Sequence, residues 1–115
     1  MHLPKLILCV YLITRFFSSV GHCQDAETLQ EEKIKSLLQQ VSTAQSARQF
    51  PQAIKLLSQI EKLDDTVAVA FYLRGRIHFQ QAAFQESVRD FNRYVTLNPK
   101  IESRQWERGI SMYYA

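Results

Sequence analysis

The stretch AVAFYLRGRIHFQQAAFQESVRDFNRYVTLNPKI, residues 68–101, decides the fold. Its apolar residues recur at helical spacing on both sides of a short polar turn, so we expect two helices joined by that turn. Much of the pattern recurs upstream at a 34-residue offset, and Gly75 recurs downstream at the same offset as Gly109. A fixed period of this length is typical of helix–turn–helix units that stack, because one unit alone cannot bury its apolar face.

The upstream copy keeps the positions that would face a neighbouring helix. At the 34-residue offset, FPQAIKLLSQIEKLDD (50–65) lies over FQESVRDFNRYVTLNP (84–99). The matched pairs include Phe50 with Phe84, Ala53 with Ser87, Ile54 with Val88 and Leu57 with Phe91. Unrelated helices would have no reason to repeat their apolar positions at one fixed offset. We therefore interpret the two segments as copies of one unit.

At these residues the chain resembles the tetratricopeptide repeat (TPR) family. The family pattern is W-x₂-L-G-x₂-Y, then A-x₃-F, then P. Phe71-x₂-Arg74-Gly75-x₂-His78, Ser87-x₃-Phe91 and Pro99 occupy those places here. The resemblance implies an all-α fold of antiparallel helix pairs, stacked as a short right-handed solenoid of about two and a half repeats. The repeats would cover about 34–67, 68–101 and, in part, 102–115, within a domain spanning 24–115.

Apolar spacing predicts helices at about 26–46, 50–63, 67–80 and 84–97, and a fifth from near Ile101 to Ala115. The first would present an apolar face that includes Leu29. Asp64-Asp65-Thr66 would end the second helix and can cap the third.

Three residues of the third helix call for a specific neighbour. Gly75 would cost about 1 kcal/mol relative to Ala in an exposed helix interior, so we expect another helix to approach it closely. Arg74 and His78 depart from the Leu and Tyr of the family pattern. Because a buried guanidinium must find a partner, we expect this pair at a partly open face.

Residues 1–23 have the features of a secretory signal peptide. They contain no acidic residue, Lys5 precedes an apolar run, and small residues follow it. The run is shorter than the ~20 residues that span a bilayer, so no membrane span is expected after cleavage. Because Arg15 interrupts the segment, an organelle transit peptide and an uncleaved anchor are alternatives. The expected location is the secretory pathway or the extracellular space.

Charge and composition argue against several function classes. Residues 24–115 carry 12 Lys and Arg against 11 Asp and Glu, with no basic stripe for nucleic acid. Cys9 would leave with the signal peptide, so Cys23 is the one thiol that the mature chain could retain, which excludes an internal disulfide or a metal-ligand motif. His78 is the one His beyond the N-terminal segment, and no glycine-rich phosphate loop appears. We therefore expect neither catalysis nor a cofactor.

The family resemblance implies a concave groove lined by the first helix of each repeat, which binds peptides or partner helices. Aromatic and Arg side chains are good anchors on such surfaces, so the candidate partner-binding residues are Tyr72, Arg76, Phe79 and Trp106. The same register adds Lys35, Leu38, Ser42, Leu73, Ser103, Glu107 and Ile110 to the groove. Chaperone-binding members resemble one another in a carboxylate clamp, whose positions here hold Leu38, Ser42, Leu73, Ser103 and Glu107. None matches, so we do not expect binding to chaperone C-terminal tails.

The C-terminal segment carries Trp106, Ile110, Met112, Tyr113 and Tyr114 with no polar capping helix after them. This surface would bind a partner or a second copy, or the chain is a fragment of a longer protein. The leading hypothesis for function is a non-catalytic scaffold for protein–protein interaction. The alternative is an accessory N-terminal segment of a larger secreted or organellar enzyme.

Overall fold

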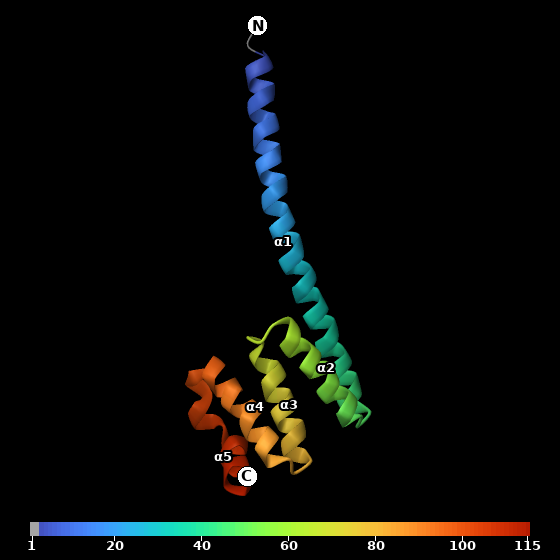
Figure 1. Ribbon diagram of the computed structural model, residues 1–115, viewed down its shortest axis with the longest axis vertical. Coiled ribbons are helices and arrows are strands. Elements are labelled where there is room, and N and C mark those ends of the chain that lie inside the picture. Colours follow the sequence, from blue (N-terminus) through green and yellow to red (C-terminus); the bar gives the residue numbers. More distant parts are fainter. Residues whose placement is uncertain (1–2) are drawn as a thin grey trace. The chain divides into compact units, whose positions relative to one another are not determined.

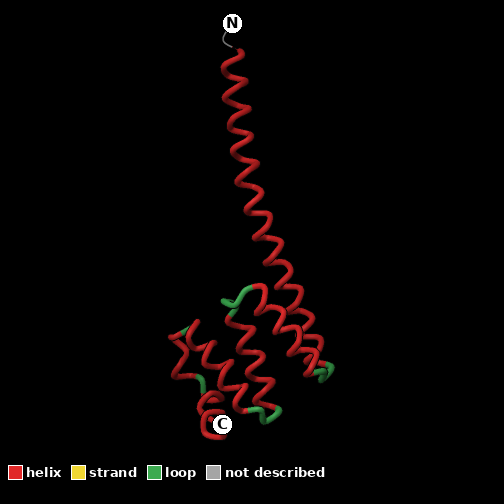
Figure 2. The backbone as a smooth tube through the Cα atoms, viewed as in Figure 1, coloured by secondary structure: helices red, strands yellow, loops and turns green. Residues whose placement is uncertain are grey.

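The protein is all-α, as expected. The computed structural model describes the backbone of residues 3–115 and the side chains of 25–101 and 105–115. Its elements are α1 (Leu3–Ser46), α2 (Phe50–Leu63), α3 (Ala68–Gln80), α4 (Phe84–Leu97), the 3₁₀ helix η1 (Pro99–Arg104) and α5 (Trp106–Tyr114) (Figure 1). Between residues 3 and 115 there is no strand (Figure 2). The chain divides into two compact units, Met1–Lys33 and Ile34–Ala115.

Helix α1 begins at Leu3, so the expected start near residue 26 is wrong. That boundary was placed where the composition becomes polar, but residues 5–46 contain no proline, and nothing there removes a backbone hydrogen bond. All of residues 25–33 are exposed, including Leu29 at 66%. The predicted apolar face therefore starts to pack only in the second unit, where Leu37, Val41 and Ala44 are buried.

In the second unit, successive helices run in opposite directions (Figure 1). One core cluster joins the end of α1 to α2 and α3. Its buried members are Leu37, Val41, Ala44, Ala53, Leu56, Leu57, Ile60, Ala70 and Ile77. Helices α2 and α4 begin and end at the predicted residues, because Pro51 suits the first turn of α2 and the apolar residues of both recur with helical period.

The close approach predicted at Gly75 is confirmed. A Cβ atom added there would lie 2.8 Å from Cε1 and 2.9 Å from Cδ1 of Phe91, and 3.3 Å from Cβ of Asp90. Both of these residues belong to α4. The missing side chain therefore lets α4 pack directly against the backbone of α3.

The turns α1–α2 and α3–α4 have the same backbone structure. Each contains a residue with positive φ that is not glycine, Arg48 at 56° and Ala82 at 58°, and these residues are 34 positions apart. In each turn that residue donates its N–H to the carbonyl three residues back, and the next residue donates to the carbonyl five back. The bonds are Arg48 to Gln45 (3.0 Å), Gln49 to Ala44 (2.8 Å), Ala82 to Phe79 (3.1 Å) and Ala83 to His78 (2.8 Å). This pair of bonds defines a Schellman motif, so the 34-residue period extends to the backbone.

Two further predictions about helix ends are wrong. The N-cap of α3 is Val67, without a side-chain capping bond. Asp64 instead accepts hydrogen bonds from the backbone N–H (2.9 Å) and the hydroxyl of Thr66, which lower the pKa of the Asp64 carboxyl. The Asp64 carboxylate therefore accepts hydrogen bonds within the loop and does not cap α3. The fifth α-helix begins at Trp106 rather than near Ile101, because the chain after Asn98 forms the tighter turns of η1.

Candidate functional site

Helices α3 and α5 meet along one surface, which carries the four candidate residues. Tyr72, Arg76 and Phe79 lie on one face of α3 at positions i, i+4 and i+7, and Trp106 and Glu107 begin α5. We call these five residues the α3–α5 strip. The Arg76 guanidinium lies 5.7 Å from the centre of the Tyr72 ring. Nε of Arg76 lies 3.4 Å from Oε2 of Glu107.

Aromatic contacts extend the α3–α5 strip at its other end. The rings of Phe79 and Trp106 meet edge to face at 6.1 Å, and Phe79 makes a similar contact with Phe84 at 6.0 Å. Trp106 is 64% exposed, whereas Phe79 is partly buried. A partner that binds here would therefore meet an indole anchored on one edge and open on the rest.

The other predicted groove residues differ in how exposed they are. Leu38 and Leu73 are partly buried and pack against the core cluster, so placing them on an open groove is wrong. Lys35, Ser42 and Ile110 are exposed, whereas Glu107 is 8% exposed. The side chain of Ser103 lies outside the described residues. Tyr72 also packs on Tyr94 at 5.0 Å, which leaves only part of its ring to contact a partner.

Arg74 lies in a part-buried polar cluster, which agrees with the expectation of a partly open face. Its side chain is 13% exposed, and its Nε and Nη2 donate to the two carboxylate oxygens of Asp90 at 2.9 and 2.7 Å. Its Nη1 donates to Glu61 at 2.7 Å and to Ser58 at 3.2 Å. The hydrogen bonds that Arg74 donates to Asp90, above all, raise the pKa of Arg74. The spacing of the sequence did not reveal this cluster, because Asp90 is 16 residues from Arg74.

His78 lies beside the same cluster. Its side chain is 16% exposed, and its Nε2 lies 3.8 Å from Oδ2 of Asp90. Burial lowers the pKa of His78, against the opposing charges of Asp90 and Glu86. The neutral imidazole is thus favoured near neutral pH, as for a packed side chain. Among the described residues, no group of three His, Cys, Asp or Glu side chains is placed to hold a metal ion.

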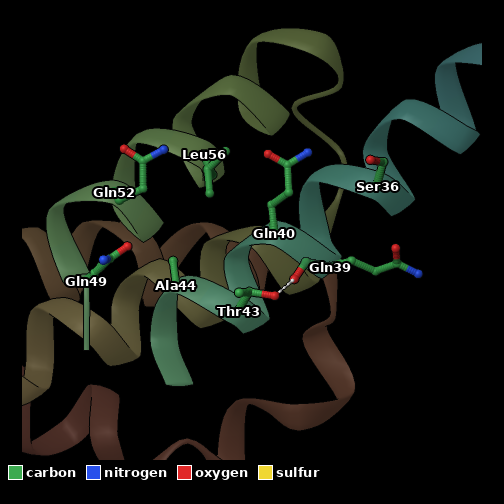
Figure 3. Close-up of a pocket in the computed structure, with 8 residues that line it drawn as sticks. All are labelled: Ser36, Gln39, Gln40, Thr43, Ala44, Gln49, Gln52 and Leu56. Atoms are coloured by element: carbon green, nitrogen blue, oxygen red, sulfur yellow. Dashed lines mark hydrogen bonds between the residues drawn. The ribbon is translucent and has the colours of Figure 1, made fainter. Parts of the chain in front are cut away.

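A shallow hollow of about 410 Å³ lies between the end of α1 and α2, and the sequence analysis did not anticipate it. Uncharged polar side chains dominate its lining: Ser36, Gln39, Gln40, Thr43, Ala44, Gln49, Gln52 and Leu56. In Figure 3 the side chain of Gln39 points away from Gln49 and Gln52, and the Thr43 hydroxyl donates to the Gln39 carbonyl at 3.2 Å. These amides do not converge on one point, so the α3–α5 strip is the stronger candidate site.

Comparisons with protein-family models, with curated proteins and with solved structures find no match. Within the described part of the chain, no helix combines the length and apolar character that crossing a membrane requires. The function must therefore be argued from the site itself.

Proposed function

We propose that this chain is a non-catalytic scaffold of the TPR type that binds a peptide or a partner helix on the α3–α5 strip. One observation carries the proposal: Arg76 and Phe79 of α3 each contact a residue of α5, Glu107 at 3.4 Å and Trp106 at 6.1 Å. Candidate anchors chosen from the repeat pattern therefore lie on one continuous surface. The 34-residue period of the turn hydrogen bonds supports the repeat assignment.

The charges of the α3–α5 strip suggest the chemistry of its partner. Glu107 lies beside Arg76 and compensates its charge, and the remaining members of the strip are aromatic. Glu107 would repel a strongly acidic tail and so offset part of its attraction to Arg76. We infer that the partner presents apolar side chains to Phe79 and Trp106, and a single polar or acidic group to the 46% exposed Arg76 side chain.

Selection of a random peptide library on the full-length protein tests this function. Selected peptides should lose about tenfold or more in affinity for Arg76→Ala, because Arg side chains dominate many binding surfaces. Gln59→Ala, at an exposed position of α2, is the matched control and should bind like the wild type. If the selected peptides bind Arg76→Ala and wild type equally, the α3–α5 strip is not the binding surface.

We further propose that the protein works after export through the secretory pathway. The support is the acid-free segment 1–23 with its short apolar run. Expression in a secreting host, followed by N-terminal sequencing of the protein from the medium, tests this. A mature chain that begins near His22 or Gln24 supports export. Retention of the intact N-terminus inside the cell contradicts it.

A further inference from the structure

Helix α5 repeats the residues of α3 that α4 covers. At the 34-residue offset, Trp106 corresponds to Tyr72, Gly109 to Gly75 and Met112 to His78. Trp106 is 64% and Met112 is 55% exposed, whereas the His78 side chain is 16% exposed. A Cβ atom at Gly109 would meet nothing within 4 Å. The helix face that α4 covers on α3 is thus exposed on α5.

Three residues of α4 cover this face of α3, and they lie at positions i, i+3 and i+4 of α4. The Ser87 hydroxyl donates to the Gly75 carbonyl at 3.0 Å. Asp90 binds Arg74 through both of its carboxylate oxygens. Two atoms of the Phe91 ring lie 2.8 and 2.9 Å from the place that a Cβ of Gly75 would occupy. The covering helix is therefore recognised by a hydroxyl, a carboxylate and an aromatic ring on one face.

The cation that holds the carboxylate also recurs in α5. Arg108 corresponds to Arg74 at the 34-residue offset. Arg74 donates to Ser58 of α2 at 3.2 Å, and Arg108 donates to Asn92 of α4 at 2.8 Å. Ser58 and Asn92 are related by the same offset, so Arg108 contacts the preceding helix as Arg74 does. It brings a positive charge beside Gly109, which is complementary to a carboxylate on an approaching helix.

We propose that α5 is a docking site for an amphipathic α-helix of a partner protein. The site, here called the open α5 face, consists of Trp106, Gly109, Met112 and Tyr113, with Arg108 beside it. The partner helix carries a small hydroxyl residue, a carboxylate and an aromatic residue at i, i+3 and i+4, and it crosses α5 as α4 crosses α3. Its aromatic ring packs on the Gly109 backbone, and its carboxylate faces Arg108.

The size of the open α5 face favours an apolar helix face over a flexible polar tail. Tyr113 is 82% exposed, and covering each large apolar side chain stabilises a complex by about 1.5–3 kcal/mol before the cost of association. The open α5 face shares only Trp106 with the α3–α5 strip. The two proposals can therefore fail independently.

A peptide with the sequence of residues 84–97, FQESVRDFNRYVTL, is the probe, because it carries the three recognition residues. An isolated helix of this length is marginal in water, so a side-chain bridge between positions 92 and 96, both exposed in α4, holds it helical. The labelled peptide is titrated with the full-length protein, and binding is followed by fluorescence anisotropy. We expect saturable binding.

Two protein variants and one peptide variant identify the docking surface. Gly109→Ala adds a single methyl group where the ring of the peptide should lie, and should weaken binding about tenfold or more. Met112→Glu should also weaken it, by repelling the carboxylate of the peptide. A peptide with Lys at the position of Asp90 should bind neither the wild type nor Gly109→Ala. Gln59→Ala is the control and should bind like the wild type.

Four outcomes would overturn the proposal. The first is no saturable binding of the bridged peptide. The second is equal affinity of Gly109→Ala and wild type, which would show that the peptide binds elsewhere, for example by displacing α4. The third is a wild-type dimer in light scattering that Gly109→Ala dissociates, since the occupant would then be a second copy. Loss of binding in Arg76→Ala alone would assign the peptide to the α3–α5 strip and would also contradict the proposal.

Discussion

Replacing Gly75 by Ala should destabilise the protein, although alanine is the better helix former. The propensity difference alone would stabilise α3 by about 1 kcal/mol. The new Cβ would lie 2.8 Å from Cε1 of Phe91, a side chain with no exposed surface, so the ring cannot swing into solvent. Overpacking of this kind costs about 1–3 kcal/mol, and the backbone of α4 must move to relieve it.

The cost should fall in the upper half of that range, because Asp90 on the same side of α4 is held by two hydrogen bonds to Arg74. After subtraction of the propensity gain, the net loss is about 1–2 kcal/mol. For a folded part of this size, that corresponds to a fall in Tm of about 5–15 °C.

Gly109→Ala is the matched control, because the same substitution at the equivalent position meets no atom within 4 Å. It should keep or raise the Tm, by up to about 1 kcal/mol of helix propensity. Both variants are measured by thermal denaturation followed by circular dichroism at the helical band. If Gly75→Ala raises the Tm as much as Gly109→Ala does, the close packing of α3 on α4 described above is refuted.

Two further predictions concern the part-buried polar cluster around Arg74. Asp90→Ala leaves Arg74 without its bidentate partner and should lower the free energy of unfolding, measured in urea, by about 3–5 kcal/mol. The control is Asp65→Ala, because the exposed pair of Asp65 with Arg93 spans 4.0 Å. The control should lower the free energy of unfolding by less than about 1 kcal/mol. Equal losses for the two variants would contradict a structural role for the cluster. Because burial lowers the pKa of folded His78 below its usual 6.5, the unfolded chain takes up the proton more readily. The contribution of His78 to the free energy of unfolding should therefore be fully present above about pH 6.5 and should be lost as the pH falls below it. The Tm, measured between pH 7 and 5, should follow this loss. His78→Gln should reduce the fall in Tm. An unchanged pH dependence in the variant would exclude His78 as the cause.

Much of the second unit is predictable from local pattern. The bounds of α2 and α4 follow from apolar spacing and from Pro51, because a helix needs only one stable face and a defined first turn. The neighbour of Gly75 was also predictable, since a helix retains such a residue in its interior when another element comes close. The helix bounds and the close neighbour of Gly75 were both inferred from residues that lie within one or two helical turns of each other.

The errors arise where a residue's partner lies far away in the sequence. Arg74 was expected at a partly open face, but its partners were not identified, because Asp90 binds it from α4 and Glu61 from α2. Leu73 was placed on the groove by its repeat position, but it packs on the core. The start of α1 was missed because the pattern of polar and apolar residues indicates which part of a helix is buried, and does not indicate where the helix begins.

The candidate site could be predicted only as a set of residues. The repeat register placed Tyr72, Arg76 and Phe79 on one helix face, and the structure confirms that they share it. The pairing of Arg76 with Glu107 depends on the angle at which α5 meets α3, which no local pattern specifies. That these residues bind a partner stays a prediction.

The matching turns after α1 and α3 bear on how such a sequence can change over time. Their geometry is held by main-chain hydrogen bonds, with Arg48 and Ala82 in the left-handed region, where most residues are strained by about 1–2 kcal/mol. Main-chain bonds require little of the side chains. Residues 44–53, AQSARQFPQA, and residues 78–87, HFQQAAFQES, agree only at the Phe that begins each following helix. Two segments that share almost no residues can thus form the same turn between helices, and likeness among such chains is better sought in backbone torsions than in residue identity.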